Sequence, residues 1–421
     1  MSSAPPRHPW TRQRRRCAPV RLYSSEFAAD PGAAYQDLRY RYGALAPAEV
    51  APGVPVTLVT GYRAALDVLT DPSRFPADPR QWQQRVTGDC PALPMLQWRP
   101  DAMRSAGNDH ARYRRAVTDC LDRVDPFALS MTVEHAAARL IDGFCESGSA
   151  DLLSRFAIPL TVQAFNRILG LAPAAAQAAF DALALMREAT DAAAVDHGDR
   201  MLLAAMRETV SAKHAAPAGD VASWLLNHPA GLDDTEVTYQ LVMLYVTGCE
   251  PTWNLIANTL LLLMTDDRFG EELLAGALTA RDAIDEVLFA DPPLANACPR
   301  FPRQMQIIGE AILPEHQPVL VSLAAGNSDP AVGGDRTGNR SHLAWGAGPH
   351  QCPARSLAMV IVQEALDQLL DALPDIELAV PLEEVHWRAS AFHRAPAAVP
   401  TRFPPSPPLS YVHTSPSLPH L

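Results

Sequence analysis

The sequence has almost no lysine, and its cysteines lack the spacing that is typical of disulfide frameworks or metal sites. Lys213 is the only lysine among 35 basic residues, a bias that we attribute to a GC-rich genome. The seven cysteines are scattered, odd in number and never spaced as Cys-x-x-Cys. This spacing argues against a disulfide framework and against a structural zinc site, and it favours a reducing cytoplasm.

The chain also lacks an excess of positive charge and an apolar N-terminal segment. Its formal charge of −12 argues against nucleic acid as a partner. The first residues, MSSAPPRHPWTRQRRRC, are polar and basic, and no apolar stretch follows them. We therefore expect neither a signal peptide nor a membrane anchor, and we expect the protein to be cytoplasmic.

The sequence does contain enough hydrophobic residues to form the core of one large domain. It is 48% hydrophobic and 19% charged, which supports a sizeable core and excludes global disorder. We find no internal repeat and no clear linker. The expected organisation is a disordered basic segment over residues 1–20, one domain over 21–403, and an unpacked Pro/Ser-rich tail over 404–421. Arginines in the basic segment would either touch an acidic surface or remain solvated.

Apolar spacing predicts a mainly helical domain with a smaller β-region. A helix is expected after Asp30, then a strand in VTLVTG and a helix in YRAALDVLTDPSRF. Residues 125–228 read as successive helices. Asp233 and Glu236 predict the start of a long helix, in which Glu250 is the only charge from Val237 to Thr265. Its length of roughly 44 Å would cross a domain, and its internal polar residues favour a buried central helix over a membrane span.

The stretch HLAWGAGPHQCPARSLA, residues 342–358, places one cysteine at the head of a helix. A glycine-rich loop precedes Cys352, and a helix is expected from Ala354 to Leu370. Backbone N–H groups and the helix dipole stabilise a thiolate at this place, while glycines let the backbone pass close to a large flat ligand. The pattern indicates a sulfur offered to a metal. The alternative is a small buried hydrophobic side chain.

The same stretch resembles the haem-binding loop of the cytochrome P450 superfamily, F-G-x-G-x-H-x-C-x-G. The resemblance implies a haem b whose iron is bound by the Cys352 thiolate, inside one large mainly α domain with a smaller β-region. Ala354 replaces the last glycine of the motif. The other matching positions are Trp345, Gly346, Gly348 and His350, the last at the propionate-binding position.

Within the long helix, TGCEPT resembles the family's distal-helix motif A/G-G-x-D/E-T-T. The resemblance implies that Gly248 lets haem and oxygen approach the backbone and that Glu250 is the acid of a proton relay. Pro251 replaces the alcohol that supports oxygen protonation. Thr252 lies about 100° further round the helix, and it would substitute only if a kink at the proline rotates it inward. A structurally paired buried acid is the other interpretation of Glu250.

Three further cations match the family's propionate-binding positions. His110 and Arg114 are four residues apart, so they share a helix face, and they resemble the family's H-x-x-x-R. Arg300 aligns with its propionate-binding arginine. Arg112 and Arg115 flank the first pair and would either face an acidic redox partner or remain solvated.

A second departure from the family lies in DEVLFADPP, which resembles its E-x-x-R segment. Glu286 stands at the acid, but Phe289 replaces the arginine. An unpaired buried acid costs about 3–5 kcal/mol. We therefore expect Glu286 to be protonated, exposed, or paired with Arg303 or Arg336.

The resemblance covers residues 26–403 and implies a haem-thiolate monooxygenase acting on a small, apolar organic molecule. Ferredoxin and ferredoxin reductase would supply its electrons, and O2 its oxygen. Pro251 motivates an alternative, a peroxide-driven, coupling or rearranging enzyme. Pro251 and Phe289 together motivate a third, a haem-binding scaffold protein.

Overall fold

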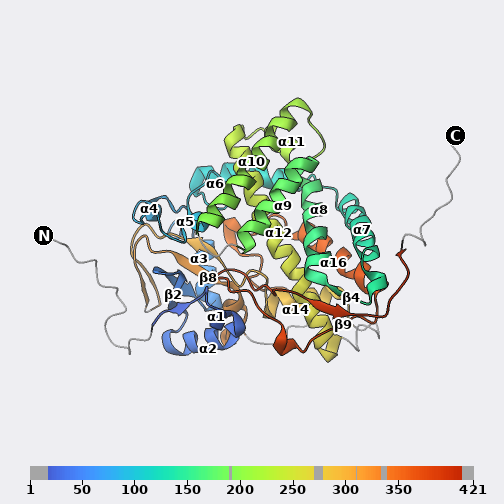
Figure 1. Cartoon of the computed structure of the whole chain (residues 1–421). Coiled ribbons are helices and arrows are strands. Elements are labelled where there is room, and N and C mark those ends of the chain that lie inside the picture. The colour runs from blue at the N-terminus through green and yellow to red at the C-terminus, as the bar shows by residue number, and fades with distance from the viewer. Residues whose placement is uncertain (1–17, 189–191, 270–277, 310, 333–338, 410–421) are drawn as a thin grey trace.

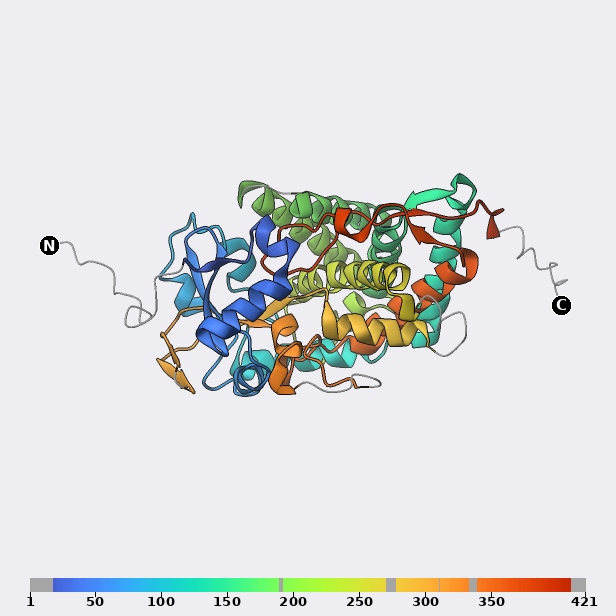
Figure 2. The ribbon, with the colours of Figure 1, turned by 90° about the horizontal axis from the view of Figure 1, so that it is seen from below.

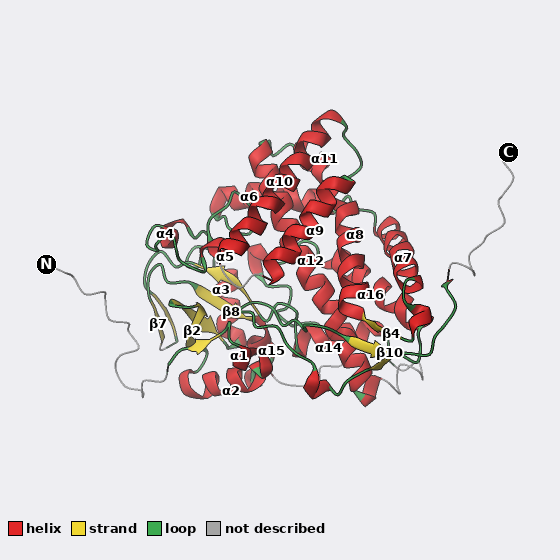
Figure 3. Cartoon of the chain, in the orientation of Figure 1, coloured by secondary structure: helices red, strands yellow, loops and turns green. Residues whose placement is uncertain are grey.

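The computed structural model describes residues 18–188, 192–269, 278–309, 311–332 and 339–409. Helices form most of this structure. Most of the strands gather at one side of it, and a separate three-stranded sheet lies at the other side (Figures 1 and 3). The helices before the long central one are α1 Ser25–Ala29, α2 Pro31–Tyr42, α3 Tyr62–Thr70, α4 Arg80–Gln83, α5 Leu93–Leu96, α6 Gly107–Leu121, α7 Pro126–Asp142, α8 Ile158–Leu169, α9 Pro173–Glu188, α10 Ala192–Ala215 and α11 Val221–Leu226. The central helix and those after it are α12 Asp234–Thr265, α14 Ala280–Ala290, α15 Leu323–Asn327 and α16 Arg355–Ala372.

The β-region is built on a five-stranded sheet in the order β1-β2-β3-β8-β5. Strands β2 and β3 form an antiparallel hairpin, β3 runs parallel to β8, and β8 pairs with β5 in the antiparallel sense. The last pair brings β5, and with it Arg300, beside the helical part of the molecule. The strands of this sheet are β1 Val20–Arg21, β2 Leu45–Ala51, β3 Val54–Val59, β5 Asn296–Arg300 and β8 Val319–Ser322. The remaining strands are β4 Ser149–Asp151, β6 Gln306–Ile308, β7 Ala311–Leu313, β9 Glu377–Leu378 and β10 Pro400–Arg402.

Helix α12 crosses the middle of the helical part, where it contacts α8, α10, α14 and α16, as the two views in Figures 1 and 2 show. Most of its residues are buried on every side, the pattern of a helix inside a core. The predicted capping box is present: the Asp233 carboxylate accepts from the Glu236 N–H, and Glu236 accepts from the Asp233 N–H. The helix continues through Pro251.

The ends of the domain differ from the sequence-based boundaries. Strand β1 begins at Val20 and pairs with β2. The tail was predicted to be unpacked from Pro404, which is wrong for residues 404–409. The Ser406 N–H donates to the Cys145 carbonyl at 3.0 Å, and the Leu409 N–H donates to Asp142 Oδ1. Residues 1–17 and 410–421 lie outside the described residues.

Membrane insertion has no support in the described part of the chain. None of its helices combines the length and the apolar character that a crossing requires.

Candidate functional site

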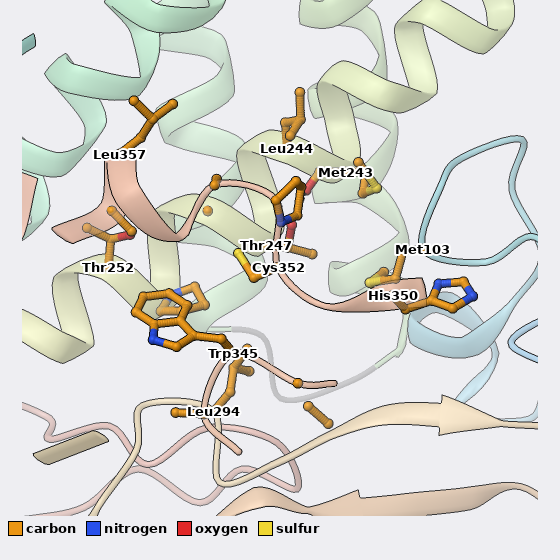
Figure 4. Close-up of a pocket in the computed structure, with 18 of the residues that line it drawn as sticks. Met103, Met243, Leu244, Thr247, Thr252, Leu294, Trp345, His350, Cys352 and Leu357 are labelled. Carbon is orange, nitrogen blue, oxygen red and sulfur yellow. The ribbon is translucent and has the colours of Figure 1, made fainter. Parts of the chain in front are cut away.

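The main pocket lies between α12, the start of α16, and β5, and its wall is largely apolar (Figure 4). Three predicted site residues, Glu250, His110 and Gly348, are not among its lining. The predicted site residues that do line it are Arg114, Gly248, Thr252, Arg300, Trp345, Gly346, His350 and Cys352. Predicted site residues from four separate parts of the chain thus meet in one cavity.

Cys352 lies in this cavity three residues before α16 begins at Arg355. Its backbone N–H donates to the Trp345 carbonyl at 2.8 Å, which closes the loop. Burial raises the pKa of the Cys352 thiol, while the Ala354 N–H and Arg114 oppose that rise. The described residues contain no cluster of three metal-ligating side chains. A metal here would therefore take one protein ligand, and its own charge would keep the sulfur deprotonated.

The two loop glycines are required for different reasons. Both have a positive φ, 68° at Gly346 and 69° at Gly348, a region that other residues rarely adopt. A Cβ on Gly348 would also collide with the Leu69 carbonyl at the end of α3. Gly348 therefore fixes the loop against α3 and does not face the cavity, whereas Gly346 does.

Four basic side chains gather at one side of the cavity: His110 and Arg114 from α6, Arg300 from β5, and His350 from the loop. The rings of His110 and His350 stack with centroids 3.8 Å apart. Burial and the neighbouring cations lower the pKa of His110 to about 4 and that of His350 to about 2. Such a cluster is costly unless an anion accompanies it.

Two buried donors of this cluster lack an acceptor within the described structure. They are Nη2 of Arg300, whose side chain belongs to a residue only 3% exposed, and Nε2 of His110. Buried polar groups normally find partners, so each such orphan requires an explanation. Carboxylates of a bound group, such as the propionates of a haem, would accept from both. The residues present therefore fit a haem.

Gly248, on the α12 wall, is covered in part by another side chain. A Cβ at this position would collide with the Phe165 ring from α8. The absence of a side chain at Gly248 therefore lets the Phe165 ring pack against α12 in the cavity wall.

Glu250 lies on another side of α12, against the segment 386–396. This segment, called the C-terminal hairpin below, is held by the Trp387–Pro396 bridge. Glu250 Oε1 accepts from Arg388 Nη1 at 2.9 Å and lies 3.9 Å from His393 Nδ1. Burial alone would raise the pKa of Glu250, but His393 and Arg388 outweigh it, and the pKa is lowered. This arrangement matches the interpretation of Glu250 as a structurally paired acid.

Pro251 and Thr252 both face the cavity. Thr252 reaches it despite its position on the helix, but it is only 4% exposed. Thr247, one turn before the proline, also lines the cavity and is exposed. Figure 4 labels both threonines on the α12 wall.

Asp285, the residue before Glu286, links α14 to the segment before the loop. Asp285 pairs with Arg340 at 2.6 Å and with Arg281 at 3.3 Å. Phe289 is buried, with its ring edge-on to His342 at 5.2 Å between centroids.

The arginines that the sequence offers as partners of Glu286 or as part of a basic face either pair with other residues or lie outside the described part of the chain. Arg303, one proposed partner of Glu286, lies 3.5 Å from Asp78, and Arg336 lies outside the described residues. Arg112 is paired with Glu236, so it does not contribute a free charge to a basic face.

Sequence reasoning missed three features of the site: the Glu250–Arg388 pair, Cys298, and Thr247. Arg388 is 138 residues away from Glu250, and no local pattern relates them. Cys298 lines the cavity from β5 with a positive φ of 55°, and its place two residues before Arg300 was the available signal. For Thr247 the available signal was its position four residues before Pro251, because a proline leaves the carbonyl at that position without its helical hydrogen bond.

Known proteins resemble the chain over most of its length, although no family model matches it. It is 31% identical over 345 residues to cytochrome P450-SU2 of Streptomyces griseolus, covering 79% of this chain and 83% of that protein. It is 29% identical over 399 residues to the monooxygenase PikC of Streptomyces venezuelae, covering 90% and 92%. The solved structure of CYP154C4 from Streptomyces sp. W2061 superposes with a TM-score of 0.83 at 25% identity, covering 92% and 98%.

Proposed function

Because the chain belongs to the cytochrome P450 family of haem-thiolate monooxygenases, we propose that Cys352 binds the haem iron and that the enzyme oxygenates a small apolar molecule. One atom of O2 enters the substrate. The observation that carries the proposal is the geometry of the cavity. One sulfur lies at the head of α16, opposite an apolar α12 wall and beside the buried nitrogens of Arg300 and His110 that lack an acceptor in the described structure.

Each group at the site has a physical task. The haem supplies the oxygen-activating redox chemistry when bound. Arg300 and His110 would donate to its propionates, Arg114 would add positive charge beside them, and the neutral ring of His350 would keep its stacking contact with His110. The apolar wall excludes water, which strengthens electrostatic interactions inside the cavity. Thr252, which lines the cavity, would hold a proton near the distal wall, in line with the family motif. Glu250 is held as a charged group by Arg388 and joins α12 to the C-terminal hairpin.

We infer the substrate class and the electron source from the family. Relatives of the chain are named mycinamicin IV hydroxylase/epoxidase and 6-deoxyerythronolide B hydroxylase, and these names support a role in bacterial secondary metabolism. The apolar wall of the cavity supports an apolar substrate of this general kind. A ferredoxin with its reductase is the proposed electron donor.

Pro251 favours a second candidate, a peroxide-driven, coupling or rearranging enzyme, because the proline puts no hydroxyl at its position on the cavity wall. Comparing product formed with peroxide against product formed with the ferredoxin chain separates the two. Product from the redox chain alone would exclude the second candidate. The scaffold hypothesis has no support beyond the two substitutions that motivated it.

The proposed ligand is tested by the absorption spectrum of the reduced, carbon-monoxide-bound protein. We expect the band position that a thiolate ligand gives, and its loss in Cys352→Ser. Cys298→Ser is the matched control because Cys298 lines the same cavity, and it should keep the band. A thiolate band that survives in Cys352→Ser would contradict the proposal.

A further inference from the structure

Pro251 changes the hydrogen bonding of the helix turn that precedes it. In an α-helix the N–H of residue 251 would donate to the carbonyl of residue 247. Proline has no N–H, so the Thr247 carbonyl has no regular donor from that position, although α12 continues through the proline. The missing bond falls on the helix turn that faces the cavity, because Thr247, Gly248 and Pro251 all line it.

The Thr247 side chain adds a second acceptor beside that carbonyl. Its hydroxyl donates to the Met243 carbonyl at 2.7 Å, so its only hydrogen is engaged within the helix. The hydroxyl oxygen retains lone pairs that can accept. Thr247 is exposed and lines the cavity. Two oxygens of one residue, both able only to accept, therefore lie at the distal wall.

Thr252 is less suited to this task. It is 4% exposed, so it offers less of its surface to a ligand. The other α12 threonines that bond back to a carbonyl are unsuitable for a different reason. Thr259 makes the same bond, to the Leu255 carbonyl at 2.7 Å, but it is 0% exposed, and the residue four positions after it is Leu263 rather than a proline.

We propose that Thr247, through its hydroxyl oxygen and its main-chain carbonyl, binds one O–H group in the distal wall of the cavity. The group is that of an ordered water or of the substrate. Two acceptors select for an O–H donor over an ether or a ketone oxygen. A water that donates one hydrogen to Thr247 keeps the other for the cavity. Thr247 would thus replace the alcohol that is absent at Pro251. This inference rests on the proposed function.

The first test measures binding by calorimetry with two probes that differ by one hydroxyl, cyclohexanol and cyclohexane. If the bound O–H group belongs to the substrate, the wild-type holoprotein should prefer cyclohexanol, and Thr247→Val should reduce that preference by about 3- to 10-fold, the usual range for one hydrogen bond. Pro251→Ala should also reduce it, because the restored N–H competes for the carbonyl. Thr247→Ser should keep it, and Thr259→Val is the matched control.

The second test measures the share of reducing equivalents lost as hydrogen peroxide during turnover. A rise in Thr247→Val, with the probe preference unchanged, identifies water as the bound group. A loss of probe preference without that rise identifies the substrate hydroxyl. Either result supports the site.

The inference is overturned if Thr247→Val behaves like Thr259→Val in both measurements, or if Thr252→Val alone shows the losses. Calorimetry reports binding whether or not the protein turns over substrate. A wild-type protein that lacks the thiolate band would therefore refute the proposed function and leave the test of Thr247 intact.

Discussion

At the scale of single residues, the partner of a buried group decides its charge more than the motif that contains it. Glu250 occupies the acid position of the distal motif, yet its carboxylate is held by Arg388 and His393 from the C-terminal hairpin. The ion pair outweighs burial and lowers the pKa of Glu250. Glu250 therefore remains charged near neutral pH and connects α12 to the hairpin.

Replacing this acid should weaken the fold in a pH-dependent way. Glu250→Gln leaves Arg388 without its charge partner, and we expect the free energy of unfolding to fall by about 1–3 kcal/mol at pH 7. A carboxylate with a lowered pKa stabilises the fold above its ordinary pKa of 4.5. The difference between variant and wild type should shrink as the pH falls from there through the folded-state pKa. Urea unfolding at pH 7 and pH 4 measures it.

Glu383→Gln is the control for that prediction, because Glu383 is an exposed acid close to the same hairpin. It should change stability little at either pH. A Glu250→Gln loss of equal size at both pH values would show that packing, rather than charge, accounts for the effect.

Single residues also show where sequence reasoning succeeds. Cys352, Gly346 and His350 lie within seven positions of one another, so the loop that joins them could be recognised as a unit. Glu250 and Arg388 are brought together only by the tertiary fold. Their pairing has no local signal, which explains why the sequence could suggest a paired acid without naming the partner.

At the scale of elements, α14 shows a connection that the family motif did not predict. Asp285 and Phe289 are four residues apart, so they lie on one face of α14. They contact Arg340 and His342, which belong to the segment before the loop. One ion pair and one aromatic contact thus join α14 to that segment. The sequence showed that the arginine of the motif is replaced by Phe289, but it did not show that Asp285 pairs with Arg340.

Loss of the Asp285 carboxylate should loosen this connection. Asp285→Asn leaves Arg340 and Arg281 without their shared acceptor charge, and we expect a loss of about 1–3 kcal/mol in the free energy of unfolding. The Asp285 side chain is 12% exposed, so solvent screens the pair only in part. Thermal unfolding of the holoprotein measures the loss, with the exposed Asp267→Asn as control. Equal unfolding temperatures for the two variants would contradict the assignment.

At the scale of the whole molecule, the cavity is the place where the two regions meet. Its wall combines α6, α12 and α16 with β5 of the five-stranded sheet. Helix positions, the capping box and the loop could be predicted from the sequence because each depends on neighbouring residues. The packing of residues 404–409 could not, since it depends on Asp142 and Cys145 far along the chain.

The position of Arg300 between the two regions makes its effect on stability depend on haem. Without haem, Arg300 is a buried cation with an unpartnered donor, and burial lowers its pKa. Arg300→Leu should therefore stabilise the haem-free protein by about 1–3 kcal/mol, because it removes an uncompensated buried charge. In the haem-bound protein the same change removes a propionate donor, so haem affinity should fall about tenfold or more. The substitution should thus stabilise the haem-free protein but weaken haem binding, as measured by calorimetric unfolding and by haem titration.

Arg63→Leu, at an exposed arginine of α3, is the control and should affect neither form. If haem affinity were unchanged in Arg300→Leu, the assignment of Arg300 to the propionates would be wrong.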